Sequence, residues 1–260
     1  MLLVVDIGNT NITIGLYDRD ALIGNYRLTT WFKRTSDEYG FMILNFLMSS
    51  HVSAEQINDV IISSVVPKIM HSFTNSIRKY IGKEPILVEP GIKTGISIKT
   101  ENPKKVGADR IVDLVGCYYS YRGNALVIDF GTATTFDYIS KDGVFKYGIT
   151  APGIGISAEA LSSQCAKLPE IEIEKPKSIL ATETITSMQA GLVYGYIGSV
   201  EYIIQKFKEE LHCDDMLVVA TGGLGKIIAQ NTDMIDIYDR DLTFKGLKLI
   251  YDKNKKEIHE

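Results

Sequence analysis

A short sequence pattern occurs twice in this chain, and it limits what the chain can fold into. Residues 3–10 read LVVDIGNT and residues 126–133 read LVIDFGTA. Each copy is an apolar run that ends in Asp, with Gly two residues later. A short apolar run followed by turn residues predicts a buried strand. Two copies more than a hundred residues apart predict an internal duplication.

The residues after each copy are also alike. Alternating runs at 13–17 and 23–29 follow the first copy, and runs at 134–139 and 144–149 follow the second. The last pair is separated by Lys141-Asp142-Gly143, and Asp-Gly is a strong hairpin signal. Each half is therefore expected to open with three strands that are joined by tight turns.

Helical and extended segments then alternate in both halves. We expect helices at 35–50, 69–81, 103–121, 156–165, 187–212 and 224–229, and strands at 59–66, 85–88 and 216–220. The charged tail 253–260 is expected to be a solvated end. This order predicts a duplicated α/β fold with mixed sheets. The N-terminal domain would cover residues 1–118 and the C-terminal domain 119–260, because Arg122-Gly123-Asn124 supplies a break close to that point.

Composition excludes several classes of protein. Of the 260 residues, 45% are hydrophobic and 23% charged, and the net charge is −4, so a basic face for nucleic acid is not expected. No run approaches the ~18 apolar residues of a membrane span, and no basic leader precedes the first apolar run. The three cysteines lie far apart, which predicts buried, reduced thiols and a cytoplasmic location.

The two Asp-x-Gly turns are suited to polyphosphate. Glycine lets the backbone approach a ligand closely, exposed N–H groups and Thr or Asn side chains hold phosphate oxygens, and Asp holds a cation. One copy alone would be a weak signal, because Gly and Asp are common turn residues and a plain hairpin corner would be the better interpretation. Two copies at equivalent points of a duplication predict a cleft between the domains with a phosphate loop from each side.

Two further glycine-rich segments each have a possible role in binding a nucleotide. Thr221-Gly222-Gly223 follows a strand and precedes a helix, where glycine backbone can pack against a flat base or ribose. Residues 153–158 read GIGISA and fit the dinucleotide pattern GxGxxA. That pattern belongs after the first strand of a βαβ unit, whereas here it follows the third strand of a hairpin set, so a nicotinamide or flavin site is not expected.

The segment 107–110, Gly107-Ala108-Asp109-Arg110, carries a carboxylate beside a guanidinium near a predicted helix start. Phosphoryl transfer to an alcohol needs a carboxylate that orients the hydroxyl and accepts its proton. An Arg side chain can bind a substrate carboxylate with two hydrogen bonds. An exposed Asp-Arg pair on a helix surface is the alternative interpretation of these residues.

The combination of motifs resembles the superfamily of actin, the heat-shock chaperone ATPases and the sugar kinases, whose phosphate and adenosine motifs follow in the same order. Within it, the chain resembles the type III pantothenate kinases. The matching segments are the initial DIGNTN at 6–11, SSVVP at 63–67, the Gly-x-Asp-Arg motif after Asn102-Pro103, DFGTAT at 129–134 and ITAPG at 149–153. The resemblance runs from residue 1 to about 230. It implies two actin-like, ribonuclease H-like domains.

The same resemblance implies a function and a set of roles. The reaction would be phosphorylation of pantothenate by Mg–ATP to 4'-phosphopantothenate, the first step of coenzyme A biosynthesis, in a homodimer. Asp109 would be the general base, Thr132 would contact ATP, and Asp129 would help to bind potassium or ammonium. The ATP loop would comprise Asp6, Ile7, Gly8, Asn9, Thr10, Asn11, Ile12 and Thr13, and pantothenate would lie against Gly107, Ala108, Asp109, Arg110 and Thr184.

Some alternatives stay open at this point. Some family members have an aromatic residue just before the Asn-Pro motif, where this chain has Thr100-Glu101. Gly191, Gly195 and Gly198 lie at helix-face spacing, which fits a dimer contact and internal packing equally well. A kinase for another small alcohol, or a catalytically silent regulator that senses a ligand, would use the same fold.

Overall fold

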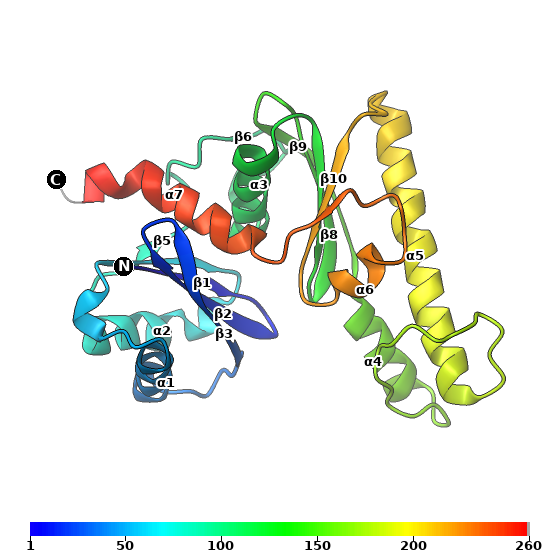
Figure 1. Ribbon diagram of the computed structural model, residues 1–260, viewed down its shortest axis with the longest axis horizontal. Coiled ribbons are helices and arrows are strands. Elements are labelled where there is room, and N and C mark those ends of the chain that lie inside the picture. The colour runs from blue at the N-terminus through cyan, green and yellow to red at the C-terminus, as the bar shows by residue number, and fades with distance from the viewer. Residues whose placement is uncertain (259–260) are drawn as a thin grey trace. The chain divides into compact units, whose positions relative to one another are not determined.

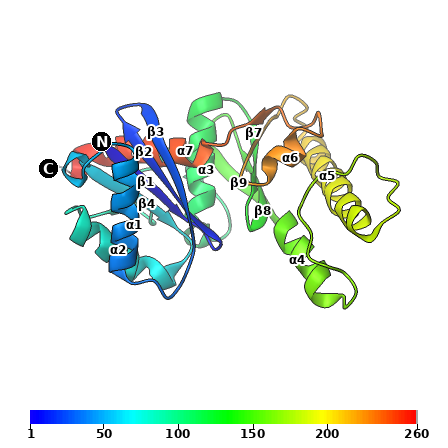
Figure 2. The same ribbon diagram turned by 60° about the horizontal axis from the view of Figure 1, so that its bottom comes forward.

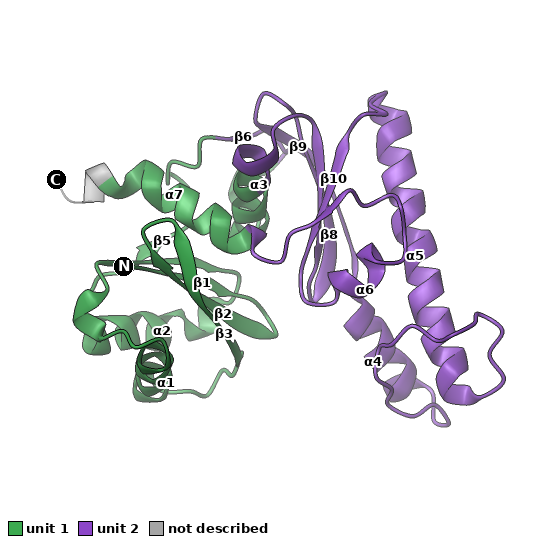
Figure 3. Ribbon diagram, in the orientation of Figure 1, with its two compact units in different colours: residues 1–95, 102–116, 243–260 green, residues 96–101, 117–242 purple. Residues whose placement is uncertain are grey.

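The computed structural model describes residues 1–258, which form two compact units (Figure 3). Unit 1 contains residues 1–95, 102–116 and the chain from 243 onward, and unit 2 contains residues 96–101 and 117–242. The chain therefore passes between the units more than once. The domain boundary between residues 118 and 119 stays a prediction, whereas the segment from 243 onward groups with unit 1.

Unit 1 contains a five-stranded mixed sheet in the order β3-β2-β1-β4-β5 (Figure 1). The strands are β1 (Leu2–Ile7), β2 (Asn11–Asp18), β3 (Ala21–Thr29), β4 (Asp59–Ser64) and β5 (Ile86–Leu87). The first three strands pair antiparallel, and β4 runs parallel to β1. The expected opening of three strands is confirmed for this half.

Unit 2 repeats that arrangement. Its sheet has the order β11-β10-β7-β8-β9-β6, in which β10 runs parallel to β7 as β4 does to β1. The strands are β6 (Ser97–Ile98), β7 (Ala125–Phe130), β8 (Ala133–Ile139), β9 (Val144–Pro152), β10 (Leu217–Thr221) and β11 (Ile237–Tyr238). The shared strand order confirms the duplication. The two-residue strands β6 and β11 were not predicted.

The helices largely follow the predicted segments. They are α1 (Ser36–Ser49), α2 (Pro67–Tyr80), α3 (Ala108–Tyr121), α4 (Ile154–Gln164), α5 (Thr184–Leu211), α6 (Gly225–Ala229) and α7 (Leu242–Ile258), with 3-10 turns η1 (Ala54–Gln56) and η2 (Pro103–Lys105). Thr35 and Glu38 form the expected capping box at the start of α1.

The prediction of a helix over 103–121 and the prediction of a solvated tail over 253–260 were both wrong. The segment 103–121 is not one helix, because Val106 adopts extended backbone between η2 and α3. The charged tail is not simply a solvated end, since α7 continues to Ile258 and Asn254 is buried in it. Residues 259 and 260 lie outside the described residues. Asn254 accepts a hydrogen bond from the Lys93 amide at 3.1 Å and donates to the Lys93 carbonyl at 2.9 Å, which ties the helix to unit 1.

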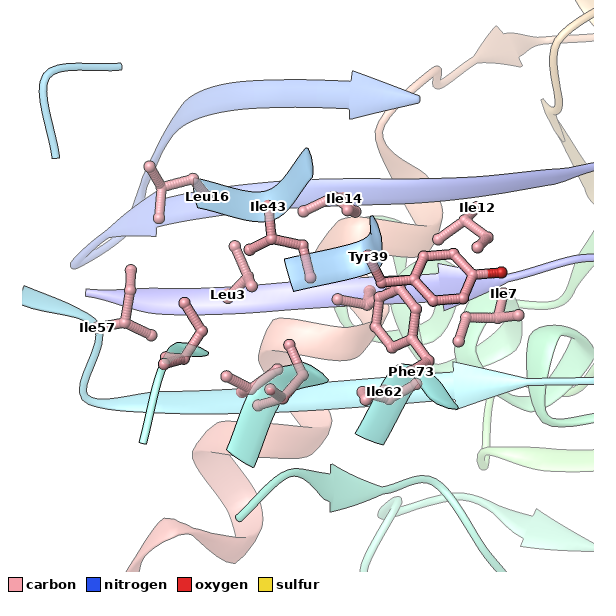
Figure 4. Packing of buried hydrophobic residues seen from close by; sticks show 14 of the residues in the cluster. Leu3, Ile7, Ile12, Ile14, Leu16, Tyr39, Ile43, Ile57, Ile62 and Phe73 are labelled. Carbon is pink, nitrogen blue, oxygen red and sulfur yellow. The ribbon is translucent and has the colours of Figure 1, made fainter. Parts of the chain in front are cut away.

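The core of unit 1 lies on one face of its sheet. Leu3, Val5 and Ile7 alternate along β1 and point into this core, as expected from the two-residue repeat of a strand. Figure 4 shows how Tyr39 from α1 and Phe73 from α2 meet these strand residues, and their rings pack edge to face with centroids 5.1 Å apart. Figure 1 shows α1 and α2 on this side of the sheet and α7 on the other.

The core of unit 2 is built in the same way. Leu126, Ile128 and Phe130 of β7 pack with residues of α5 such as Val193 and Ile204. Figures 1 and 2 show α5 as a long helix with the short α6 beside it.

Among the described residues, no helix combines the length and the apolar character that crossing a bilayer requires.

The cysteines only partly follow the prediction. Cys117 and Cys213 are buried and form no disulfide, as expected, whereas Cys165 is exposed at the end of α4. The prediction was wrong at Cys165 because its apolar character was taken to imply burial, and the polar segment after α4 provides no core for it.

Candidate functional site

Three oxygen-bearing side chains form a row across the sheet of unit 1. Asp6, the second-last residue of β1, lies opposite Thr13 of β2 and beside Ser63 of β4 in the strand register. Paired residues on neighbouring strands point to the same face of a sheet, so Thr13, Asp6 and Ser63 share one face. That face is opposite the hydrophobic core, because Ile7 and Ile12 belong to the core cluster. We call these three residues the polar row.

The turn between β1 and β2 is held from one side by Thr30, the residue after β3. The Thr30 amide donates to the Thr10 carbonyl at 2.9 Å, and its hydroxyl donates to the Gly8 carbonyl at 2.7 Å. No peptide bond among residues 1–258 is cis, so the amide that shares a peptide with each carbonyl points the opposite way. The N–H groups of Asn9 and Asn11 therefore face away from Thr30.

The segment Gly107–Arg110 lies beside the same end of this sheet. A Cβ atom on Gly107 would be 2.4 Å from Asp109 Oδ1 and 3.5 Å from Val65 Cγ1, so the carboxylate folds back over Gly107 near β4. The Val65 amide in turn donates to the Ile7 carbonyl at 3.1 Å. Unit 1 therefore brings the Asp-x-Gly turn and the Gly-x-Asp-Arg motif to neighbouring positions, although they are a hundred residues apart.

Asp109 is the second residue of α3 and is partly buried. Burial raises the pKa of its carboxyl group above the ordinary value. Two effects of Arg110 oppose the rise in pKa: its amide donates to Asp109 Oδ1 at 2.8 Å, and its guanidinium attracts the carboxylate. A desolvated carboxylate is a stronger proton acceptor than one in water, and this suits a general base.

In unit 2, Asp129 lies at the end of β7 between two glycines. A Cβ atom on Gly131 would be 3.2 Å from Asp129 Oδ2, and one on Gly222 would be 2.6 Å from Asp129 Oδ1. Gly222 has φ of +92°, a backbone conformation that other residues rarely adopt. Each oxygen of the carboxylate thus packs against the backbone of a glycine, where a larger residue would not fit.

Thr132 is exposed in the turn between β7 and β8, and Gly153 packs against the backbone of this turn. The Gly153 amide donates to the Thr132 carbonyl at 3.2 Å. A Cβ atom on Gly153 would be only 2.3 Å from that carbonyl oxygen and 2.5 Å from the Gly131 oxygen. The first glycine of the GxGxxA pattern is therefore required by packing against the turn, which explains why a dinucleotide pattern occurs here.

Thr184 is the first residue of α5, three residues before the helix start that the sequence predicted. It is exposed and lines a hollow of about 540 Å³ between α4 and α5. The other lining residues are Ser157, Leu161, Leu168, Ser187, Met188, Gly191 and Leu192. The structure thus assigns the predicted site residues to unit 1 (Asp6–Thr13 and 107–110) and to unit 2 (Asp129, Thr132 and Thr184).

Sequence reasoning did not single out Thr30 as part of a site. Its role depends on the register in which Asn11 pairs with Thr29, which brings Thr30 opposite Thr10. The predicted hairpin offered that signal, but the length of its turn had to be known to fix the register.

Among the described residues, no group of three or more His, Cys, Asp and Glu side chains is arranged to hold a metal ion.

Comparisons with known proteins agree with this geometry. The family model described as type III pantothenate kinase matches residues 2–206. A type III pantothenate kinase from Agathobacter rectalis is 56% identical over 257 residues, covering 99% of each chain. One from Bifidobacterium longum subsp. infantis is 52% identical over 256 residues, covering 98% of this chain and all of the relative.

A solved structure shows the fold independently of sequence. A candidate 2-dehydro-3-deoxygalactonokinase from Sinorhizobium meliloti superposes with a TM-score of 0.59 at 13% identity, covering 99% of this chain and 97% of the other. The two mixed sheets and this likeness confirm the predicted actin-like α/β fold of the sugar kinases. With a family model over most of its length and relatives that match it from end to end, the chain belongs to the type III pantothenate kinase family.

Proposed function

We propose that this protein transfers the γ-phosphoryl group of ATP to the primary hydroxyl of pantothenate, giving 4'-phosphopantothenate and ADP in the cytoplasm. This is the first step of coenzyme A biosynthesis. Family membership supports the reaction. The observation that carries the mechanism is the partly buried Asp109, whose pKa is raised and which lies near the end of β4 in the same unit as the Asp-x-Gly turn.

In the reaction, the Asp109 carboxylate accepts the proton of the pantothenate hydroxyl as its oxygen bonds to the γ-phosphorus. The bond from that phosphorus to the bridging oxygen breaks, and ADP leaves with the electron pair. Arg110 follows Asp109 on α3, and its guanidinium would bind the pantothenate carboxylate. Gly107, Ala108 and Thr184 complete the proposed pantothenate contacts.

The phosphate chain of ATP would lie against the turn Gly8–Thr10, where backbone N–H groups would donate to its oxygens. Thr132 would contact ATP from unit 2. The polar row fits a magnesium ion, because hard oxygen ligands are those that Mg²⁺ takes. When bound, the ion neutralises charge on the phosphates. Asp129 fits a monovalent cation, since its carboxylate adjoins the bare backbone of Gly131 and Gly222.

The reaction is tested by measuring ADP release from Mg–ATP with pantothenate and, in parallel, with a panel of sugars and small acids. Each assay is run with potassium, with ammonium and without either. We expect turnover that requires both pantothenate and a monovalent cation. Turnover only with another acceptor would replace the substrate. A folded protein that binds ATP but turns over no acceptor would be a ligand-sensing regulator.

The hydroxyl of Thr30 should matter for nucleotide binding. Thr30→Val keeps the shape and the amide hydrogen bond to Thr10 but removes the hydrogen bond to the Gly8 carbonyl. We expect KM for ATP to rise about fivefold to tenfold with kcat little changed, because one hydrogen bond that orients the turn is lost. Steady-state kinetics measure this, and Thr30→Ser should restore the wild-type KM. An unchanged KM in Thr30→Val would exclude the role.

We also propose a homodimer in which α5 packs against α5 of a second copy. Gly191, Gly195 and Gly198 are exposed, and a Cβ atom on any of them would meet no heavy atom within 4 Å. The apolar residues beside them, including Val193 and Ile197, point into unit 2 instead. Internal packing therefore does not explain the three glycines, whereas close approach of another helix does.

The dimer is tested by increasing the size of the side chain at one of these positions. Gly195→Leu should block the close approach of two helices, so light scattering should give the mass of one chain. Gly195→Ala is the smaller substitution and should weaken the dimer less. Gly195 is exposed and an added Cβ would meet no heavy atom of the same chain within 4 Å, so both variants should fold. A Gly195→Leu variant with the mass of two chains would contradict this interface.

A further inference from the structure

Ser63 has a buried hydroxyl that the protein itself does not satisfy. The residue is fully buried near the end of β4. Its Oγ atom makes no hydrogen bond with any group in residues 1–258, the part of the chain that the structure describes. A hydroxyl taken out of water without a partner lowers the stability of the fold, so such a group calls for an explanation.

Other serines of the same unit show that this is not a general property of its core. Ser76 on α2 is as fully buried as Ser63, and its hydroxyl donates to the Phe73 carbonyl at 2.6 Å. Ser64, the next residue, accepts a hydrogen bond from the Val66 amide at 3.1 Å. An alanine at position 63 would avoid the unsatisfied hydroxyl and still fit the buried strand.

The position of Ser63 indicates what its hydroxyl binds. Asp6 is its register partner on β1, and Thr13 lies on the far side of Asp6, so the hydroxyl forms one end of the polar row. Neighbouring strands lie about 4.8 Å apart, so a ligand held by the Asp6 carboxylate is within reach of a hydroxyl on either side.

The charge of Asp6 selects between two kinds of ligand. A phosphate oxygen placed directly beside the carboxylate would be repelled, whereas a cation would be attracted. Magnesium usually keeps several of its water molecules in proteins, and a serine hydroxyl can both donate to and accept from water. A hydrated divalent cation therefore satisfies the carboxylate and the hydroxyls together.

We propose that Ser63 is a binding residue for the hydrated divalent cation that accompanies ATP, which it holds jointly with Asp6 and Thr13. This role rests on the proposed function, because it assumes that the polar row receives Mg–ATP. The hydroxyl is then unsatisfied only in the ligand-free protein. It is retained for binding at a cost to the stability of the fold.

The test compares Ser63→Ala with Ser76→Ala in the full-length protein without pantothenate. Thermal unfolding is measured without ligand, and calorimetry measures binding of a non-hydrolysable ATP analogue with magnesium and with EDTA. For Ser63→Ala we expect an unchanged or higher Tm, an affinity about tenfold lower with magnesium, and no change in EDTA. For Ser76→Ala we expect the reverse: a lower Tm, and binding like that of the wild type.

Three results would overturn the role of Ser63. An equal loss of affinity with and without magnesium would make it a direct phosphate contact. A lower Tm with unchanged affinity would make its hydroxyl a structural group. Unchanged Tm and affinity would leave the hydroxyl without function. If the wild-type protein fails to bind the magnesium form of the analogue, the proposed function itself fails, so the two failures are distinguishable.

Discussion

Replacing Asp109 with Asn lowers kcat for pantothenate phosphorylation by about 10³-fold, within the range that loss of a general base produces. The amide has nearly the same shape as the carboxylate, but it cannot accept the proton of the substrate hydroxyl. Steady-state kinetics at saturating ATP measure the loss. Because an interaction of the transition state is removed, kcat and kcat/KM should fall together.

The same substitution should not destabilise the protein at neutral pH. The pKa of Asp109 is raised in the folded state, so the folded state binds this proton more tightly than the unfolded state does. Ionising the group therefore costs stability as pH rises above the unfolded pKa. Asp109→Asn removes this cost, so its free energy of unfolding should equal or exceed that of the wild type at pH 7, with the advantage fading in acid.

Asp113 provides the matched control for this prediction. It lies one turn further along α3, is buried, and accepts a hydrogen bond from Thr243 Oγ1 of α7 at 2.6 Å. Asp113→Asn replaces this charge-assisted hydrogen bond with a weaker neutral one, so it should lower the free energy of unfolding while kcat stays within a few-fold of the wild type. An Asp109→Asn variant with nearly full kcat would end its assignment as the base, whatever its stability.

The duplicated pattern was enough to predict most of the fold. Residues 3–10 and 126–133 both read as a buried strand followed by a glycine turn, and they became β1 and β7 with the same neighbours in each sheet. Local signals also set the start of α1, where Thr35 caps the helix as its spacing to Glu38 implied. Signals that depend only on residues close together in the chain, such as strand alternation and helix caps, can be recognised directly in a sequence.

The contacts that shape the site could not be predicted in this way. Thr30 reaches the Gly8 carbonyl only because of the β2–β3 register, and Ser63 lies beside Asp6 only because β4 pairs parallel with β1. The helix α7 was missed because the end of its sequence is polar. Its first half packs against the protein, where Phe244 is buried and Gly246 lies close to the Val112 carbonyl of α3. Each of these features depends on pairing between distant segments.

Gly153 shows the same dependence on tertiary contacts and carries the prediction with the largest effect on stability. Its backbone angles, φ of −68° and ψ of 156°, are open to any residue, so Ala is not excluded by conformation. The obstacle is that a Cβ atom would lie 2.3 Å from the Thr132 carbonyl oxygen and 2.5 Å from that of Gly131. Both are backbone atoms, so relief requires the β7–β8 turn itself to move.

Gly153→Ala should therefore lower the free energy of unfolding by about 2–3 kcal/mol, as overpacking does, and raise KM for ATP about tenfold by displacing Thr132. Urea unfolding and steady-state kinetics measure the two effects. Gly155→Ala is the control, because its Cβ would meet only Leu224 Cδ1 at 3.9 Å and α4 would gain up to about 1 kcal/mol of helix propensity. The two substitutions, two residues apart, should thus shift stability in opposite directions. If the two variants had the same free energy of unfolding, the β7–β8 turn could move without loss of stability. Gly153 would then not hold Thr132 in place.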